Sequence, residues 1–492
     1  MQGRIPEEYQ RASDEELHAR ISAARQTLGE RVVVLGHFYQ RDEVVQHADF
    51  VGDSFQLARA SQGRPEAEAI VFCGVHFMAE TADLLSTPDQ AVILPNLAAG
   101  CSMADMADLD SVEDAWDQLE AVYGTAPDDD GRVPLLPVTY MNSSAALKGF
   151  VGERGGIVCT SSNASAVLDW AFERAQRVLF FPDQHLGRNT GRARGIPLEQ
   201  MPTWNPRLPL GGNSEDALRE AKVLLWHGFC SVHRRFTVAQ IEQARAEHPD
   251  VQVIVHPECP LPVVEAADSS GSTDFIVKAI QAAPAGSTFA IGTEINLVQR
   301  LAAQHPEHTI FCLDPVICPC STMYRIHPGY LAWVLEELVA GRVVNRITVP
   351  ASVADPARTA LERMLAVAPK QSAAQSAGAG TSTPADRAPG DAGPAAGRGA
   401  DRGRSARRGR ALGRRLLGGL RPGAGPDHRA RGGARGRGAL RHERPRGRLP
   451  ARRPGRVRHP APGRRRRAVP PAPSSPRSPA PPARCCAPNA WR

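Results

Sequence analysis

The chain has 492 residues and a formal net charge of +7, but this average hides two parts of opposite charge. The residues after 370 hold 29 arginines and 5 acidic residues, about +24, so the first 370 residues carry about −17. No run of about 18 apolar residues is present, which excludes a membrane-spanning helix, and the polar start "MQGRIPEEYQ" is unlike a secretory signal peptide. We therefore expect a cytoplasmic protein without a membrane partner.

Strand and helix patterns alternate through the first three quarters of the chain. After an expected N-terminal helical segment, a short apolar run ends in a polar cluster and a helix-like stretch follows, ten times over. Continuous apolar runs of this length are typical of strands buried on both faces, so the alternation predicts an α/β fold with parallel sheets, divided into two or three similar domains. The runs lie within residues 31–40, 69–81, 91–105, 135–146, 156–165, 177–187, 222–236, 251–260, 287–296 and 309–321.

Polar side chains gather where these predicted strands end. In open parallel sheets, ligands bind outside the carboxyl ends of the strands. If the predicted domains face one another, one polar cleft could therefore be shared by His37, Tyr39, Asn142, Ser161, His256, Glu258 and Glu294.

Three cysteines crowd the segment "CLDPVICPCSTMYRI", at Cys312, Cys318 and Cys320. The spacings C-x5-C and C-x-C match neither a zinc finger nor a two-cluster ferredoxin, so spacing leaves open whether they form a metal site of their own. Five other cysteines precede residue 368, and we expect Cys73, Cys159 and Cys259 to be packed thiols. Signatures of P-loop, dinucleotide-binding, radical S-adenosylmethionine and HExxH metal proteins are absent from the sequence.

The end of the chain is rich in Arg, Pro, Gly and Ala and nearly lacks Ile, Phe and Tyr. Such a segment buries too little apolar surface to offset chain entropy, so we expect residues 368–492 to form a disordered tail. An Arg-rich arm could bind nucleic acid, but the composition also matches GC-rich DNA read out of frame. We favour the second interpretation and expect no nucleic-acid partner.

Nine stretches, in order, resemble the quinolinate synthase family, the iron–sulfur enzymes of de novo NAD biosynthesis. They are "GHFYQRDEVVQHADFVGDSFQLAR", "FCGVHFMAETADLL", "GCSMAD", "TYMNSSAALK", "CTSSNA", "GFCSVH", "HPEC", "GSTDFIVKAI" and "GTEINLVQRL", followed by the three-cysteine segment. The resemblance implies three similar three-layer α/β/α domains with approximate threefold symmetry around a central [4Fe–4S] cluster, one per chain. With residues 1–29 as the helical segment, the expected domains are 30–115, 116–235 and 236–367.

The resemblance also implies the ligands of that cluster: Cys101, Cys230 and Cys320. In the family, Met follows the third ligand by three residues, as Met323 follows Cys320, although Ser321 stands where Pro is usual. Cys318 therefore stays an alternative. Three ligands leave one iron open as a Lewis acid, which suits the family's reaction, the condensation of iminoaspartate with dihydroxyacetone phosphate to quinolinate, phosphate and two waters. L-aspartate oxidase is the implied functional partner.

Roles carried over from the family complete the expected site. His256 and Glu258 form the best acid–base pair, Tyr39 is a second proton-transfer candidate, and catalytic roles are implied for Glu258, His256, Tyr39 and Tyr140. Substrate binding is implied for His37, Ser54, Tyr140, Met141, Asn142, Ser161, His256, Pro257, Glu258, Ser272 and Thr273. The "GST" motif also has an ordinary interpretation as a helix N-cap, and another iron–sulfur hydro-lyase is the alternative function.

Overall fold

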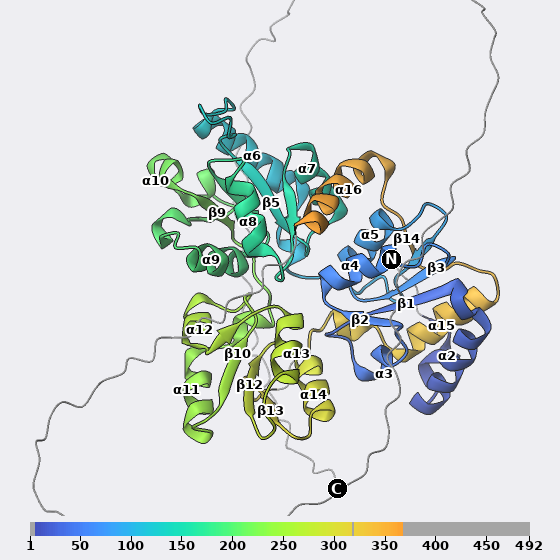
Figure 1. The fold of residues 1–492 in the computed structure, drawn as a ribbon. Helices are drawn as coiled ribbons and strands as arrows, with labels where there is room; N and C mark the ends of the chain where they lie inside the picture. Colours follow the sequence, from blue (N-terminus) through green and yellow to red (C-terminus); the bar gives the residue numbers. More distant parts are fainter. Residues whose placement is uncertain (1–4, 317–318, 368–492) are drawn as a thin grey trace, which may run out of the picture. The chain divides into compact units, whose positions relative to one another are not determined.

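The computed structural model describes residues 5–316 and 319–367, and their strands form three separate sheets (Figure 1). All ten predicted apolar runs contain a strand, and these ten strands pair with one another only in parallel. The predicted α/β fold with parallel sheets is therefore confirmed. Cys318 and the predicted tail, residues 368–492, lie outside the described residues.

The three sheets repeat one strand order. In each sheet, four strands lie side by side in an equivalent order: β2-β1-β3-β4, β6-β5-β7-β9 and β11-β10-β12-β13. We number these four strands first to fourth by their order along the chain, so that β4, β9 and β13 are the fourth strands. The first sheet contains β1 (Val32–His37), β2 (Phe50–Gly52), β3 (Ala69–Cys73), β4 (Ala91–Ile93) and β14 (Arg346–Ile347). The second contains β5 (Leu136–Tyr140), β6 (Ile157–Cys159), β7 (Val178–Phe181), β8 (Thr203–Trp204) and β9 (Val223–Trp226). The third contains β10 (Gln252–Val255), β11 (Ser269–Ser270), β12 (Thr288–Gly292) and β13 (Thr309–Cys312).

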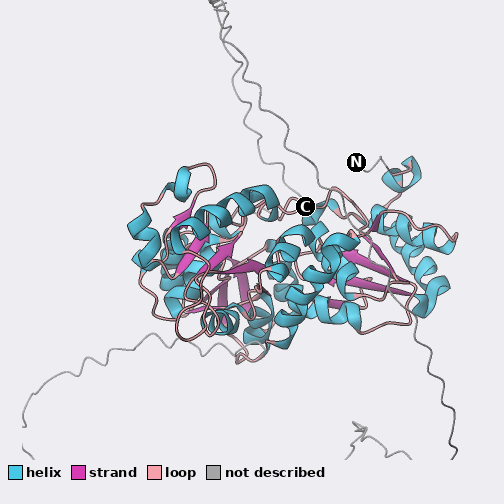
Figure 2. Cartoon of the chain, turned by 90° about the horizontal axis from the view of Figure 1, so that it is seen from above, coloured by secondary structure: helices cyan, strands magenta, loops and turns pink. Residues whose placement is uncertain are grey.

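Helices flank the strands, as the view from above shows (Figure 2). Many begin where a strand ends, because a polar residue there accepts the free N–H groups of the first turn; Asp53 caps α4 in this way. The helices are α1 (Glu7–Arg11), α2 (Asp14–Leu28), α3 (Asp42–Val45), α4 (Ser54–Gln62), α5 (His76–Leu85), α6 (Leu109–Tyr123), α7 (Ala145–Glu153), α8 (Ala164–Phe172), α9 (Gln184–Ala193), α10 (Glu215–Glu220), α11 (Val238–Glu247), α12 (Leu261–Ala266), α13 (Thr273–Gln281), α14 (Ile295–Gln304), α15 (Pro328–Val339) and α16 (Ala351–Ala366).

The last described elements pack on the first two sheets. Helix α15 contacts α2, strand β14 pairs with β4, and α16 lies against α7. Their buried side chains join the core of the first and second sheets, whereas the third sheet has its own apolar cluster on each face. The domain bounds stay a prediction, but these contacts tie residues 328–366 to both earlier sheets. In the described part of the chain, no helix is long and apolar enough to cross a membrane.

Candidate functional site

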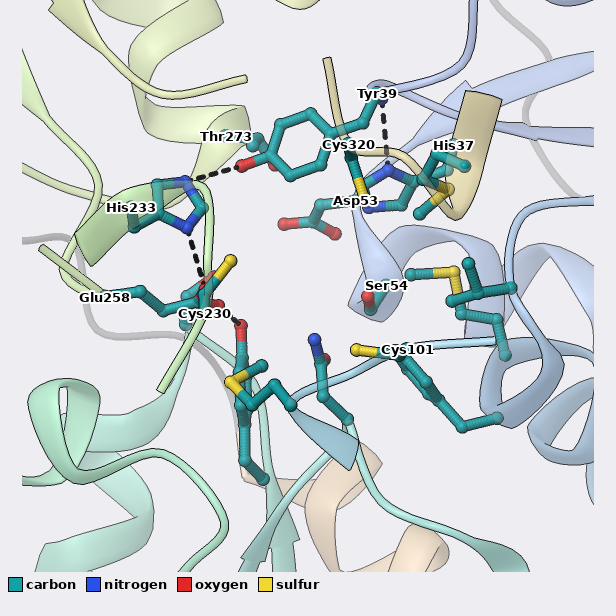
Figure 3. A pocket seen from close by; sticks show the side chains of 18 of the residues that line it. His37, Tyr39, Asp53, Ser54, Cys101, Cys230, His233, Glu258, Thr273 and Cys320 are labelled. Carbon is teal, nitrogen blue, oxygen red and sulfur yellow. Dashed lines mark hydrogen bonds and ion pairs between the residues drawn. The ribbon is translucent and has the colours of Figure 1, made fainter. Parts of the chain in front are cut away.

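One pocket collects side chains from the strand ends of all three sheets (Figure 3). Its empty volume, including the opening to solvent, is about 630 Å³. Ligands bind at the carboxyl ends of parallel strands because loops and helix starts meet there. The repeated strand order brings three equivalent positions of each sheet to this pocket.

The first strand of each sheet contributes a pair of residues two positions apart. The pairs are His37 and Tyr39 at the end of β1, Tyr140 and Asn142 at the end of β5, and His256 and Glu258 just after β10, and all six line the pocket. In two of the pairs, Nδ1 of the histidine accepts the backbone N–H of its partner, at 3.1 Å from Tyr39 and 3.3 Å from Glu258. Equivalent backbone positions therefore carry different chemical groups.

The second strand of each sheet contributes a hydroxyl. Ser54, Ser161 and Thr273 follow β2, β6 and β11, and each lines the pocket. Ser54 and Thr273 are the first residues of helices α4 and α13. Hydroxyls and free N–H groups at helix starts suit phosphate and carboxylate groups, so these residues fit an anionic substrate.

The fourth strand of each sheet is followed by one cysteine of the pocket: Cys101, Cys230 and Cys320. Each cysteine lies three residues before a short 3₁₀ helix, at Ala104–Met106, His233–Arg235 and Met323–Arg325. Each cysteine carbonyl also accepts the N–H four residues on, at 3.1, 3.0 and 2.9 Å. The sulfur atoms of the three face one open space in Figure 3. The same local backbone structure therefore occurs at all three cysteines and directs their thiols into one space.

These donors fit a metal centre held by three sulfur ligands. Burial raises the pKa of the Cys101 thiol to about 12 and that of Cys230 well above its usual value, and the neighbouring cysteines add to both shifts. A second set of donor atoms, from Cys230, His233 and Glu258, lies within 4.8 Å of one another and could also hold an ion. The nitrogens and oxygens of this second set, however, are already hydrogen-bonded to protein partners.

Glu258 is the centre of that hydrogen-bond network. Tyr140 Oη donates to its Oε1 at 2.6 Å, and His233 Nδ1 lies 2.8 Å from its Oε2. On the other side of its ring, His233 Nε2 lies 3.1 Å from Thr293 Oγ1 and 3.4 Å from Tyr39 Oη, and these two hydroxyls are 2.7 Å apart. A continuous path for protons therefore runs from Tyr39 to Glu258.

The pKa values of these groups set their protonation at neutral pH. Burial raises the pKa of Glu258, but the nearby imidazoles of His233 and His256 and the hydrogen bond from Tyr140 outweigh it and lower the pKa below its usual range. Burial lowers the pKa of His37 and His256 to about 3. Burial and the Glu258 charge raise the pKa of Tyr140 and Tyr39 well above 10. The site therefore offers a carboxylate base, neutral imidazoles and neutral phenols.

Three residues implied by the resemblance lie outside the pocket lining. The Met141 side chain is buried, with its sulfur 3.5 Å from Thr81 Oγ1. The carbonyl of Pro257 accepts the side-chain amide of Asn189 at 2.7 Å, and Ser272 caps helix α13. The other residues to which the resemblance assigns substrate binding or catalysis line the pocket, and Cys73, Cys159 and Cys259 are buried, as expected of packed thiols.

Sequence reasoning overlooked five polar residues of this region. His233, Asp53, Thr160 and Thr322 line the pocket, and Thr293 joins the hydrogen-bond network. His233 stands within the motif "GFCSVH", three residues after Cys230, so its place close to a predicted ligand was the available signal. Thr293 directly precedes Glu294 at the end of a predicted strand, where only the fold shows which side chain joins the hydrogen-bond network.

Comparisons with known proteins agree on one family. A family model described as "NadA: Quinolinate synthetase A protein" matches residues 19–366. The chain is 80% identical over 365 residues to quinolinate synthase of Corynebacterium glutamicum, covering 74% of this chain and 91% of the relative. Identity is 55% over 363 residues to quinolinate synthase of Herpetosiphon aurantiacus (74% and 95% covered) and 54% over 359 residues to that of Streptomyces coelicolor (72% and 89% covered).

Proposed function

Because this chain belongs to the quinolinate synthase family, we propose that it condenses iminoaspartate with dihydroxyacetone phosphate to give quinolinate, phosphate and two waters. The observation that carries the proposal is the triplet of Cys101, Cys230 and Cys320, one from each sheet, in a pocket that also holds Glu258. A buried carboxylate base beside a three-thiol centre suits a reaction that removes C–H protons and expels hydroxyl groups.

The three thiols are the ligands we propose for a [4Fe–4S] cluster. Like Cys101 and Cys230, Cys320 lies three residues before a 3₁₀ helix, and its carbonyl accepts the N–H four residues on. This shared local structure supports Cys320 as the third ligand. When bound through three cysteines, the cluster supplies one iron with an open position, a Lewis acid for a substrate oxygen.

Glu258 is the general base in this proposal. Its ionised carboxylate faces the pocket and takes a proton from a substrate carbon, and the Nδ1 side of His233 holds its second oxygen in place. The accepted proton passes from Glu258 to Nδ1 of His233 as the ring releases its Nε2 proton to Thr293 or Tyr39, whose oxygens lie within 3.4 Å of Nε2. Tyr39 gives its own phenol proton to a departing hydroxyl and takes the relayed proton in its place, which is the role of a general acid.

The remaining pocket residues bind and orient the substrates. His37 and His256 are neutral, so they accept or donate hydrogen bonds without adding charge. Tyr140 and Asn142 offer a phenol and an amide to carboxylates. The hydroxyls of Ser54, Ser161 and Thr273 converge from three sheets and suit the phosphate or the carboxylates of the substrates.

The substrate chemistry points to a supplier. Iminoaspartate is an oxidation product of aspartate and hydrolyses readily in water, so we propose a functional link to L-aspartate oxidase and a cytoplasmic location. Both rest on the proposed reaction.

The test uses the full chain, purified without oxygen. We expect about four irons and four sulfides per chain and quinolinate from the two substrates. Cys320→Ala loses the cluster and the activity, whereas the matched control Cys312→Ala, which removes a thiol of the same sheet outside the lining of the pocket, keeps both. Retention of the cluster in Cys320→Ala with its loss in Cys318→Ala moves the third ligand to Cys318. A wild-type chain without a cluster overturns the proposal.

A further inference from the structure

Two buried carboxylates behind the pocket hold the backbone of two of the three cysteines. Asp183 Oδ2 accepts the N–H of Cys230 at 3.2 Å, and Glu294 Oε1 accepts the N–H of Cys320 at 3.1 Å. Both acidic side chains are fully buried, and neither lines the pocket. A buried carboxyl group is costly unless its oxygens are hydrogen-bonded. For both side chains, one of the donors is the backbone N–H of a pocket cysteine.

The two carboxylates occupy equivalent places in the repeated fold. Asp183 follows β7 and Glu294 follows β12, which are the third strands of their sheets, and each caps the helix that comes next, α9 or α14. Each reaches across to the cysteine that follows the fourth strand of the same sheet. In the first sheet the equivalent cap of α5 is Val75, which has no side-chain hydrogen bond to the helix.

Each carboxylate divides its two oxygens between two tasks. Asp183 Oδ1 accepts the N–H of Leu186 at 2.7 Å and so caps α9, which leaves Oδ2 for Cys230. Glu294 Oε2 accepts the N–H of Asn296 at 2.8 Å and so caps α14. Its Oε1 accepts both the Asn296 side-chain amide at 2.9 Å and the N–H of Cys320. An ordinary N-cap needs only the first task, so the second requires its own reason.

We propose that Asp183 and Glu294 are positioning residues for the metal centre, which fix the peptides of Cys230 and Cys320 so that both thiols face the same point as Cys101. The inference rests on the proposed function, because it concerns the cysteines that would hold the cluster. Removal of one residue that orients a metal ligand in this way typically lowers the metal affinity about 10- to 100-fold.

The two side chains also occupy the N–H groups of Cys230 and Cys320, which are therefore not free to donate to a bound cluster. Hydrogen bonds to sulfur help to set the reduction potential of an iron–sulfur cluster. A side chain that cannot accept the cysteine N–H frees this donor, and a hydrogen bond from it to sulfur would favour the reduced, more negative cluster. The reduction potential therefore shifts to more positive values in the variants.

Asp183→Asn is the sharpest variant, because Asn and Asp are equally good N-caps. The amide oxygen of Asn can keep the bond to Leu186, while its NH₂ group faces the N–H of Cys230 and cannot accept it. We expect the melting temperature of the metal-free chain to fall, because two buried N–H donors then lack an acceptor, and a chelator to remove iron at about 10- to 100-fold lower concentration. Glu294→Gln should show the same two changes for Cys320.

The matched control is Thr237→Ala, which removes the cap of α11, a helix of 10 residues like α9 and α14, and touches no predicted ligand. The proposal is overturned if Asp183→Asn and Asp183→Ala both hold iron as tightly as wild type, or lose iron only as far as Thr237→Ala does. A wild-type chain without a cluster would instead refute the proposed function, so the two failures are distinguishable.

Discussion

The fourth-strand ends and the first-strand ends of the three sheets form two contrasting regions of one pocket. The fourth-strand ends repeat the same residue in the same local structure, at Cys101, Cys230 and Cys320. The first-strand ends share their backbone positions but carry imidazole, phenol, amide and carboxylate groups instead. Repetition suits a centre that needs three equal ligands, whereas the chemistry of an asymmetric substrate needs unlike groups. In the proposed function, the fold therefore separates the cofactor ligands from the acid–base groups.

Among the variants that test this contrast, Glu258→Gln should have the largest effect on activity. The amide cannot take a proton from carbon, so kcat should fall by about 10²- to 10⁴-fold. The iron content should remain that of wild type, because Glu258 belongs to the first-strand ends. Anaerobic assays of quinolinate formation, together with iron and sulfide analysis, measure both. Loss of iron in this variant would instead support the mixed donor set of Cys230, His233 and Glu258.

A smaller loss is expected from Thr293→Val, which keeps the shape of the side chain and removes the hydroxyl between Tyr39 and His233. If protons travel along this path, kcat falls by roughly 10-fold or more while KM changes little, since the transfer step has lost one of its partners. The matched control is Thr139→Val, at a buried threonine of strand β5 whose hydroxyl bonds only its neighbour's carbonyl. Equal kcat in the two variants would remove the relay from the mechanism.

The loop after Tyr140 depends on a buried lysine, and its effect should appear as a pH dependence of stability. Lys148 Nζ donates to the carbonyls of Met141 and Ser143, at 2.9 and 2.5 Å, which fixes the loop that carries Asn142. Burial lowers the pKa of Lys148 from 10.5 to about 8. Between pH 8 and 10.5 the unfolded chain therefore binds more protons than the folded chain, and stability from this group rises with pH.

Lys148→Met removes this contribution, so the wild type should gain stability relative to the variant by roughly 1.4 kcal/mol per pH unit across that range. Urea unfolding of both chains at pH 7.5 and pH 10 measures the difference, and groups common to the two cancel. A difference that stays constant with pH, or moves the other way, would show that Lys148 titrates as in the unfolded chain.

The smallest effect should come from Ser272→Ala. Ser272 accepts the N–H of Phe275 at 3.3 Å and caps α13, so its loss should cost about 1 kcal/mol of folding free energy. Thr273→Val, at the neighbouring residue that lines the pocket, should instead raise KM. If Ser272→Ala instead shows a large rise in KM with unchanged stability, Ser272 binds substrate.

Much of this architecture could be predicted from the chain, because long apolar runs such as "RVVVLG" are buried on both faces of a sheet. The strands without such runs could not, and β2, β8, β11 and β14 have only two or three residues each. A helical pattern also does not name its partner, so the packing of α16 against α7 was not visible. The directions of single side chains could not be predicted either: Met141 points into the core although Tyr140 and Asn142 line the pocket.

In the proposed function, three cysteines and no fourth hold the metal centre. Mössbauer spectroscopy of the full chain, loaded with ⁵⁷Fe and measured with and without quinolinate, tests this ligand set. We expect about four irons per chain, of which one alone changes its signal when quinolinate is added, because only that iron lacks a cysteine. Four irons that all stay unchanged, or a single metal ion per chain at Cys230, His233 and Glu258, would contradict it.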